Sequence, residues 1–152
     1  MRVALDTNVL AYLARLERSD ADGAKVVAIR KLLPLIAQRA EIVVSVQALG
    51  EFYSVLGKFG YSLADRKEAT LRMRAQFGIV GSDESTLLSA LDLACDHHLQ
   101  FWDALIINVA ADAECAMLLS EDMQNGFSWR GVTVVNPFAD PLDTRLARLI
   151  DD

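Results

Sequence analysis

Residues 2–8, with the sequence R-V-A-L-D-T-N, decide the fold because they place a short apolar run directly before an aspartate. The run Arg2 to Leu5 predicts a short buried strand, and the apolar residues that recur at helical spacing after Asn8 predict a helix. Asp6 is therefore expected at the carboxyl end of a strand. In open α/β sheets, this is the edge at which ligands bind.

The same alternation of short apolar runs and longer helical patterns continues along the chain. Further strands are expected at residues 42–45, 116–119 and 132–135, while residues 77–80 could form a short strand or a connector. Helices are expected around residues 9–16, 25–39, 46–56, 63–76, 83–97 and 103–113. Strands separated by helices need crossover connections. The pattern therefore predicts an α/β fold with a mostly parallel central sheet flanked by helices.

Several residues indicate where helices should begin, bend or end. Pro34 should mark a kink or a boundary within the second expected helix. Gly57 and Gly60 should end the third, and Ser62 can cap the fourth, in which Leu71 is expected to face the core.

Composition indicates one compact domain. The chain has 152 residues, of which 53% are hydrophobic, and we expect residues 1–138 to form the domain, with residues 139–152 a C-terminal tail that forms a short helix packed on it. No secretory segment is recognised, and no apolar run approaches the roughly 20 residues of a membrane span. A soluble, cytoplasmic protein with no membrane association is expected. Cys95 and Cys115 lack metal-ligand spacing, which favours buried free thiols.

Four carboxylates lie at the edges of strongly apolar segments: Asp6, Glu51, Asp103 and Asp122. Asp6 and Asp122 follow expected strands, Glu51 adjoins the apolar face of a helix, and Asp103 falls in the first turn of another. Burying an isolated carboxylate is costly, so four of them beside the core suggest a shared cation. With no paired His or Cys ligands, the set suits a hard divalent ion such as Mg²⁺.

Each acid also has a purely structural explanation. Asp6, Thr7 and Asn8 are all good helix caps, Asp103 could be an ordinary first-turn acid, and Asp122 could be a turn residue. Neither a helix cap nor an exposed helix face accounts for Glu51. The joint arrangement therefore favours a metal site over four independent structural roles.

The chain resembles a known family in four strings that occur in order: L-D-T-N-V-L, L-G-E-F, F-W-D-A-L-I and L-L-S-E-D-M-Q-N-G. They look like the motifs of PIN-domain nucleases, in particular VapC-type toxins of bacterial toxin–antitoxin pairs, and the similarity extends from Val3 to Phe138. Any one string is weak, but all four in order are rather specific. The resemblance implies a PIN-like three-layer fold and a pocket that binds Mg²⁺ or Mn²⁺ and cuts RNA.

The resemblance assigns roles residue by residue. The catalytic residues and metal ligands would be Asp6, Glu51, Asp103 and Asp122. Supporting or substrate-contacting residues would be Thr7, Asn8, Ser120 and Asn125. Asn125 departs from the family pattern, since many relatives have an acid near this position. If a second metal ion depends on that acid, this chain would bind one ion more tightly than the other. The implied partners are an RNA substrate, a cognate antitoxin and a second copy of the chain in a homodimer.

Other functions remain open at this point. A catalytically inactive PIN-like module that binds RNA or protein is the main alternative. An aspartyl phosphatase would need an acid where Asn8 stands, and no G-x-x-x-x-G-K string for a nucleotide hydrolase occurs. The net charge of −6 argues against a broadly basic nucleic-acid surface.

Residues that would contact RNA are harder to identify. Basic side chains on the fourth expected helix could hold phosphates, although a solvated helix face explains them as well: Arg66, Lys67, Arg72 and Arg74. Tyr12, Tyr53 and Trp102 flank motif acids and could stack on bases, but core packing is the preferred explanation for each.

Overall fold

Strand β1 (Arg2–Leu5) lies inside a six-stranded sheet with the order β3-β2-β1-β4-β6-β5, in a computed structural model that describes residues 1–151. The other strands are β2 (Glu41–Ser45), β3 (Gly78–Val80), β4 (Cys115–Leu119), β5 (Ser128–Trp129) and β6 (Val132–Val135). Every pairing is parallel except that of β5 with β6, which is antiparallel.

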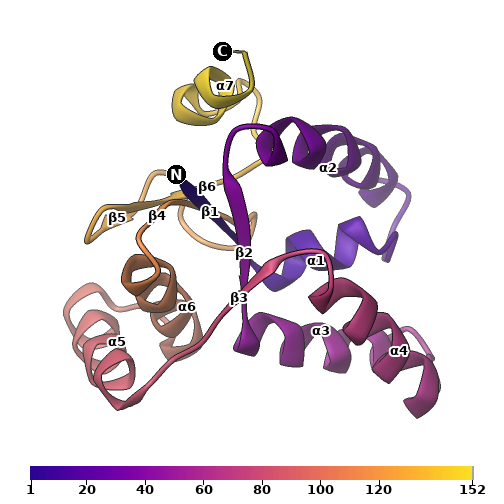
Figure 1. Cartoon of the computed structure of the whole chain (residues 1–152), viewed down its shortest axis with the longest axis horizontal. Helices are drawn as coiled ribbons and strands as arrows, with labels where there is room; N and C mark the ends of the chain where they lie inside the picture. Colours follow the sequence, from indigo (N-terminus) through magenta and orange to yellow (C-terminus); the bar gives the residue numbers. More distant parts are fainter. Residues whose placement is uncertain (152) are drawn as a thin grey trace.

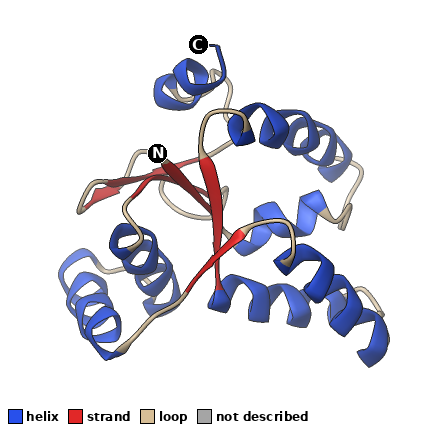
Figure 2. Cartoon of the chain, in the orientation of Figure 1, coloured by secondary structure: helices blue, strands red, loops and turns tan. Residues whose placement is uncertain are grey.

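Helices cover both faces of this sheet, as Figures 1 and 2 show. They are α1 (Thr7–Leu13), α2 (Asp22–Ala37), α3 (Val46–Lys58), α4 (Leu63–Arg74), α5 (Glu84–His97), α6 (Phe101–Asp112) and α7 (Thr144–Asp151). Helices α5 and α6 lie on one side of the sheet, and α1 and α2 lie on the other (Figure 1). The predicted α/β fold with a mostly parallel sheet is confirmed.

The core explains why the strands read as continuous apolar runs. Strand β6 is buried at every position, and β1 is buried from Val3 onward, because helices cover both faces of the sheet. Helix α6 is buried from Ala104 to Ala111, since it packs against both the sheet and α5. This buried helix fixes the position of Asp103 in its first turn. Among residues 1–151, no helix is long and apolar enough to cross a membrane.

One predicted helix boundary and one predicted helix end were wrong. Helix α2 runs through Pro34 to Ala37, so Pro34 does not divide it, and the buried Leu33 and Ile36 keep this part of the helix packed on the core. Helix α3 continues through Gly57, where the Arg66 guanidinium packs against the position that a Cβ atom would occupy. The turn comes instead at Gly60, whose φ of 82° suits glycine.

Three further expectations need correction. Leu71 is exposed, and Met73 is the buried residue of α4. Cys95 is exposed on α5, whereas Cys115 is buried as expected. Strand β5 is too short for a periodicity to reveal it, and it was missed.

The C-terminal segment ends in α7, which lies against α2 (Figure 1). Leu146 is fully buried there and anchors the helix.

Candidate metal centre and active site

Asp6 lies where β1 passes into α1. Its backbone N–H donates to the carbonyl of Leu119 over 3.0 Å, which extends the pairing of β1 with β4 by one residue. Its Oδ1 accepts from the backbone N–H of Thr7 at 2.7 Å and so caps α1. The side chain is only 7% exposed. The cap explanation is therefore correct in itself, but it uses only one carboxylate oxygen.

The other oxygen of Asp6 belongs to a polar network that crosses from β1 to β4. Ser120 Oγ donates to Asp6 Oδ2 at 2.7 Å, and Asn8 Nδ2 donates to the same oxygen at 3.0 Å. Asn8 Nδ2 also lies 3.2 Å from Oδ2 of Asp122. A single amide group thus contacts two of the candidate acids.

Glu51 reaches the same region from α3. Thr7 Oγ1 donates to its Oε2 at 2.9 Å, and Gln47 Nε2 donates to its Oε1 at 2.7 Å. The Glu51 side chain is half-buried. The three consecutive residues Asp6, Thr7 and Asn8 therefore connect to both Glu51 and Asp122.

Asp103 completes the group from the first turn of α6. Its carboxyl group has a raised pKa, caused first by burial and then by the negative charges of Glu51 and Asp122. Asp103 and Asp122 both line a cavity of about 240 Å³. The structure thus brings the four predicted acids to one edge of the sheet, at the carboxyl ends of β1 and β4.

Electrostatic strain is greatest at Asp6. Burial raises the pKa of its carboxyl group to about 6, while hydrogen bonds from Ser120 and Thr7 act in the opposite direction. The charges of Glu51 and Asp103 raise it further. An additional cation at this place would relieve both the burial and the repulsion.

The donor set fits a hard divalent ion in its chemistry, because it consists of carboxylate oxygens supported by hydroxyl and amide groups. Within residues 1–151, however, no three acidic, histidine or cysteine side chains already form a closed ligand group. Polar side chains connect the acids instead, as Asn8 does between Asp6 and Asp122. Binding an ion would require these side chains to rearrange.

A charged cluster supports the loop that carries Asp122. Lys25 Nζ lies 2.8 Å from Oε2 of Glu121 and 3.7 Å from Oδ1 of Asp22. The hydroxyl of Tyr12 donates to the other oxygen of Glu121. Glu121 is thus held by α1 and α2, which fixes the chain one residue before Asp122.

Asn125 is placed differently from the other predicted support residues. Its Oδ1 accepts from the backbone N–H of Asn136 at 2.8 Å, which ties the loop after β4 to the end of β6. Among the hydrogen bonds within residues 1–151, Asn125 makes none to the four acids.

Sequence reasoning missed three contributors to this site. Gln47 lies one helical turn before Glu51, a spacing that could have revealed it. The Lys25–Glu121 pair had no such signal, because its partners are far apart in sequence. His98 lines the cavity beside Asp103 and Asp122 at the end of α5.

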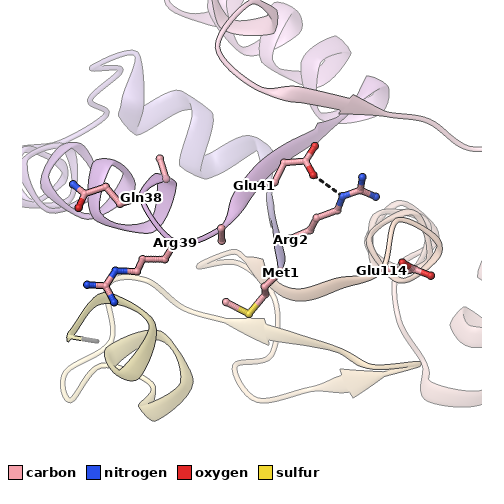
Figure 3. Close-up of a pocket in the computed structure, with 8 residues that line it drawn as sticks. Met1, Arg2, Gln38, Arg39, Glu41 and Glu114 are labelled. Atoms are coloured by element: carbon pink, nitrogen blue, oxygen red, sulfur yellow. Dashed lines mark hydrogen bonds and ion pairs between the residues drawn. The ribbon is translucent and has the colours of Figure 1, made fainter.

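A larger cavity lies elsewhere, at the amino ends of β1 and β2. It measures about 600 Å³, and Figure 3 shows the Arg2–Glu41 ion pair at its wall, with Arg39 and Glu114 nearby. None of the four candidate acids lines it. Because parallel sheets bind ligands at the opposite edge, the smaller cavity beside Asp103 and Asp122 is the better candidate site.

Comparison with known proteins gives one family match and several similar structures. The family model of the PIN domain matches residues 3–125. A search among curated proteins finds no match.

Three solved structures share this fold at low sequence identity. A toxin–antitoxin complex from Klebsiella pneumoniae has 18% identity and a TM-score of 0.65, over 90% of this chain and 98% of that one. VapBC2 from Rickettsia felis, bound to a DNA fragment from its promoter, has 15% identity and a TM-score of 0.64, and the match covers 88% of this chain and 97% of that one. VapC20 from Mycobacterium tuberculosis, a toxin that cleaves the sarcin-ricin loop, has 18% identity and a TM-score of 0.60, over 76% and 86%.

Proposed function

The chain belongs to the PIN-domain family, and from this premise we propose that it is a metal-dependent endoribonuclease, the toxin of a type II toxin–antitoxin pair. One observation carries the proposal. The adjacent residues Thr7 and Asn8 contact Glu51, Asp6 and Asp122 at once, which gathers three acids from distant parts of the chain. A helix cap alone requires no such convergence.

Asp6, Glu51, Asp103 and Asp122 would hold Mg²⁺ or Mn²⁺. When bound, such an ion supplies positive charge that activates water and stabilises charge on the phosphate oxygens. Ser120 and the backbone of Thr7 orient Asp6, while Asn8 orients Asp122. The proposed products, by resemblance to the family, carry a 3′-hydroxyl and a 5′-phosphate.

The same proposal includes partners. An antitoxin would block the acidic pocket, and an arginine or lysine from it would suit the unbalanced negative charge there. The similar structure from Klebsiella pneumoniae is a toxin–antitoxin complex and that from Rickettsia felis is VapBC2, which supports an antitoxin partner. A complex with no basic side chain near Asp6 or Asp122 would refute this mode of inhibition. A homodimer and a cytoplasmic location complete the proposal.

We also assign the nuclease domain to residues 1–138 and a supporting tail to residues 139–152. The buried Leu146 and the contact of α7 with α2 support packing of the tail on the domain.

A catalytically inactive binding module is the competing hypothesis, and metal titration separates the two. Binding of Mn²⁺ or Mg²⁺, together with cleavage of single-stranded RNA that stops in chelator, is expected of the nuclease. An absence of metal binding would leave only the binding module. The Asp6→Asn protein should fold and lose cleavage, and an active Asp6→Asn protein would overturn the proposed role of Asp6.

A further inference from the structure

A second cavity opens directly beside Glu51, between α3 and the start of α6. It measures about 490 Å³, and Thr7 and Glu51 line it as well as belonging to the candidate active site. Its remaining wall includes Gly50, Lys58 and Trp102, and we call it the Trp102 groove. Glu51 is one of the four candidate acids and Trp102 directly precedes another, Asp103, so a strand whose phosphate lies at the acids would pass this groove.

Trp102 has the features of a stacking platform. Its side chain is 59% exposed, which core packing does not explain. Its ring meets that of Phe101 edge-on, with centroids 4.9 Å apart, and this contact limits its freedom. Exposed aromatic rings in a groove bind unpaired bases by stacking, with little dependence on sequence.

Lys58 supplies a positive charge farther along the same face. It follows Glu51 by seven residues, so the two lie on one side of α3, about 10 Å apart along the helix axis. Within residues 1–151, Lys58 forms no ion pair with a carboxylate. It is thus free to contact a phosphate beyond the one at the acids.

The floor between these residues is open and polar. A Cβ atom added to Gly50 would meet no atom within 4 Å. The Oε1 atom of Gln47 is buried and has no hydrogen-bond partner among the described residues, while its amide nitrogen holds Glu51. An unpaired buried acceptor is costly, so Gln47 leaves an unmet hydrogen bond at the wall of the groove.

We propose that the Trp102 groove binds the single-stranded RNA that flanks the cleaved phosphate, with a base stacked on Trp102 and a phosphate at Lys58. This inference rests on the proposed nuclease function and names its substrate contacts. The acids alone repel RNA when no metal is present, so a base platform and a cation beside them would retain the strand.

Kinetics of RNA cleavage test the groove with three variants. Trp102→Ala should raise KM about tenfold and leave kcat nearly unchanged, because stacking is lost while the acids are intact. Lys58→Ala should likewise raise KM. It should in addition reduce the slope of log KM against log salt concentration by about 0.7, the value for one phosphate contact on a single strand. Gly50→Leu should raise KM by filling the groove, whereas Gly50→Ala should not. Tyr61→Ala and Lys31→Ala serve as controls on exposed residues outside the groove.

A binding measurement provides a readout that does not depend on cleavage. In an Asp6→Asn background, single-stranded RNA should quench tryptophan fluorescence, and Trp102→Phe should remove most of that quenching although Trp129 remains. Equal quenching by a duplex of the same sequence would overturn the preference for single strands.

The outcomes separate the two proposals. If the parent protein cuts no RNA with Mn²⁺, the proposed function fails. If it cuts RNA and all three groove variants keep the parental KM, only the groove is refuted. If Trp102→Ala changes the oligomeric mass of the protein and leaves KM unaltered, the RNA-binding proposal for the groove is likewise refuted, because Trp102 then belongs to a protein–protein interface.

Discussion

The ammonium group of Lys25 lies 2.8 Å from the carboxylate of Glu121, and Glu121 leads directly into Asp122. The contact joins α2 to the loop after β4, and Tyr12 donates a further hydrogen bond to Glu121. Glu121 and its neighbours thus determine where the backbone of Asp122 lies.

The Lys25→Met variant tests this relationship. It should leave Glu121 without its cationic partner, lower the free energy of unfolding by about 1 kcal/mol and weaken metal binding about tenfold through displacement of Asp122. Thermal unfolding and Mn²⁺ calorimetry would measure both effects. Arg72→Met, which removes the exposed Arg72–Glu68 pair, is the control and should alter neither. Metal binding by Lys25→Met at the parental affinity would show that the cluster does not position Asp122.

The hydroxyl of Thr7 is expected to set the position of Glu51. Thr7→Val keeps the side-chain shape but removes the donor to Glu51 Oε2, so affinity for Mn²⁺ should fall about tenfold or more. Thr7→Ser keeps the hydroxyl and should retain most of the affinity. Calorimetric titration compares the two, and equal affinities would exclude a positioning role for the hydroxyl.

Stability in chelator should fall as the pH rises from about 4 to about 7. Burial raises the pKa of Asp6 from 3.8 to about 6, so the folded state holds this proton more tightly than the unfolded state. The stabilisation is complete below the pKa that Asp6 has in the unfolded state, and it is lost as the pH rises through the pKa of the folded state. The free energy of unfolding changes by at most about 3 kcal/mol.

The Asp6→Asn variant provides the comparison for this pH dependence. Chemical denaturation across this range should give a flatter profile for Asp6→Asn, and near pH 7 the variant should match or slightly exceed the parent in stability. The gain should be limited, since the new amide faces donors from Asn8 and Ser120. Parallel profiles for the two proteins would contradict the assignment to Asp6.

The two cysteines should differ in reactivity. Cys95 is exposed and should react with a thiol reagent in the native protein, whereas burial encloses Cys115 and raises its pKa to about 11. We expect one reactive thiol per native chain and two in denaturant, counted by mass spectrometry. Cys95→Ser should abolish the native reaction, and modification of Cys115 in that folded variant would show that its strand opens.

The sequence predicted the strands of the parallel part of the sheet well, for reasons that lie in local chemistry. Strands β1 and β6 are apolar because both faces of a parallel sheet are covered, so Arg2–Leu5 and Val132–Val135 were found with correct bounds. Asp6 was expected directly after its strand, and the structure has it there, between β1 and α1 at the carboxyl edge of the sheet.

Features that depend on tertiary contacts could not be predicted. Gly57 disfavours a helix by propensity, but α3 continues through it, and the Arg66 guanidinium occupies the space that a side chain there would need. Leu71 was assigned to the core from its apolar character, although the neighbouring elements cover Met73 instead. The Lys25–Glu121 contact joins residues whose proximity exists only after the sheet has formed.

The bond between Ser120 and Asp6 spans 114 positions of the chain, and it forms only when β4 pairs with β1. A polypeptide still being synthesised has Asp6 and Glu51 at an early stage but lacks the strand that brings Asp122 to them. Assembly of the four acids therefore waits until β4 and the residues that follow it have left the ribosome, long after Asp6 and Glu51 have done so.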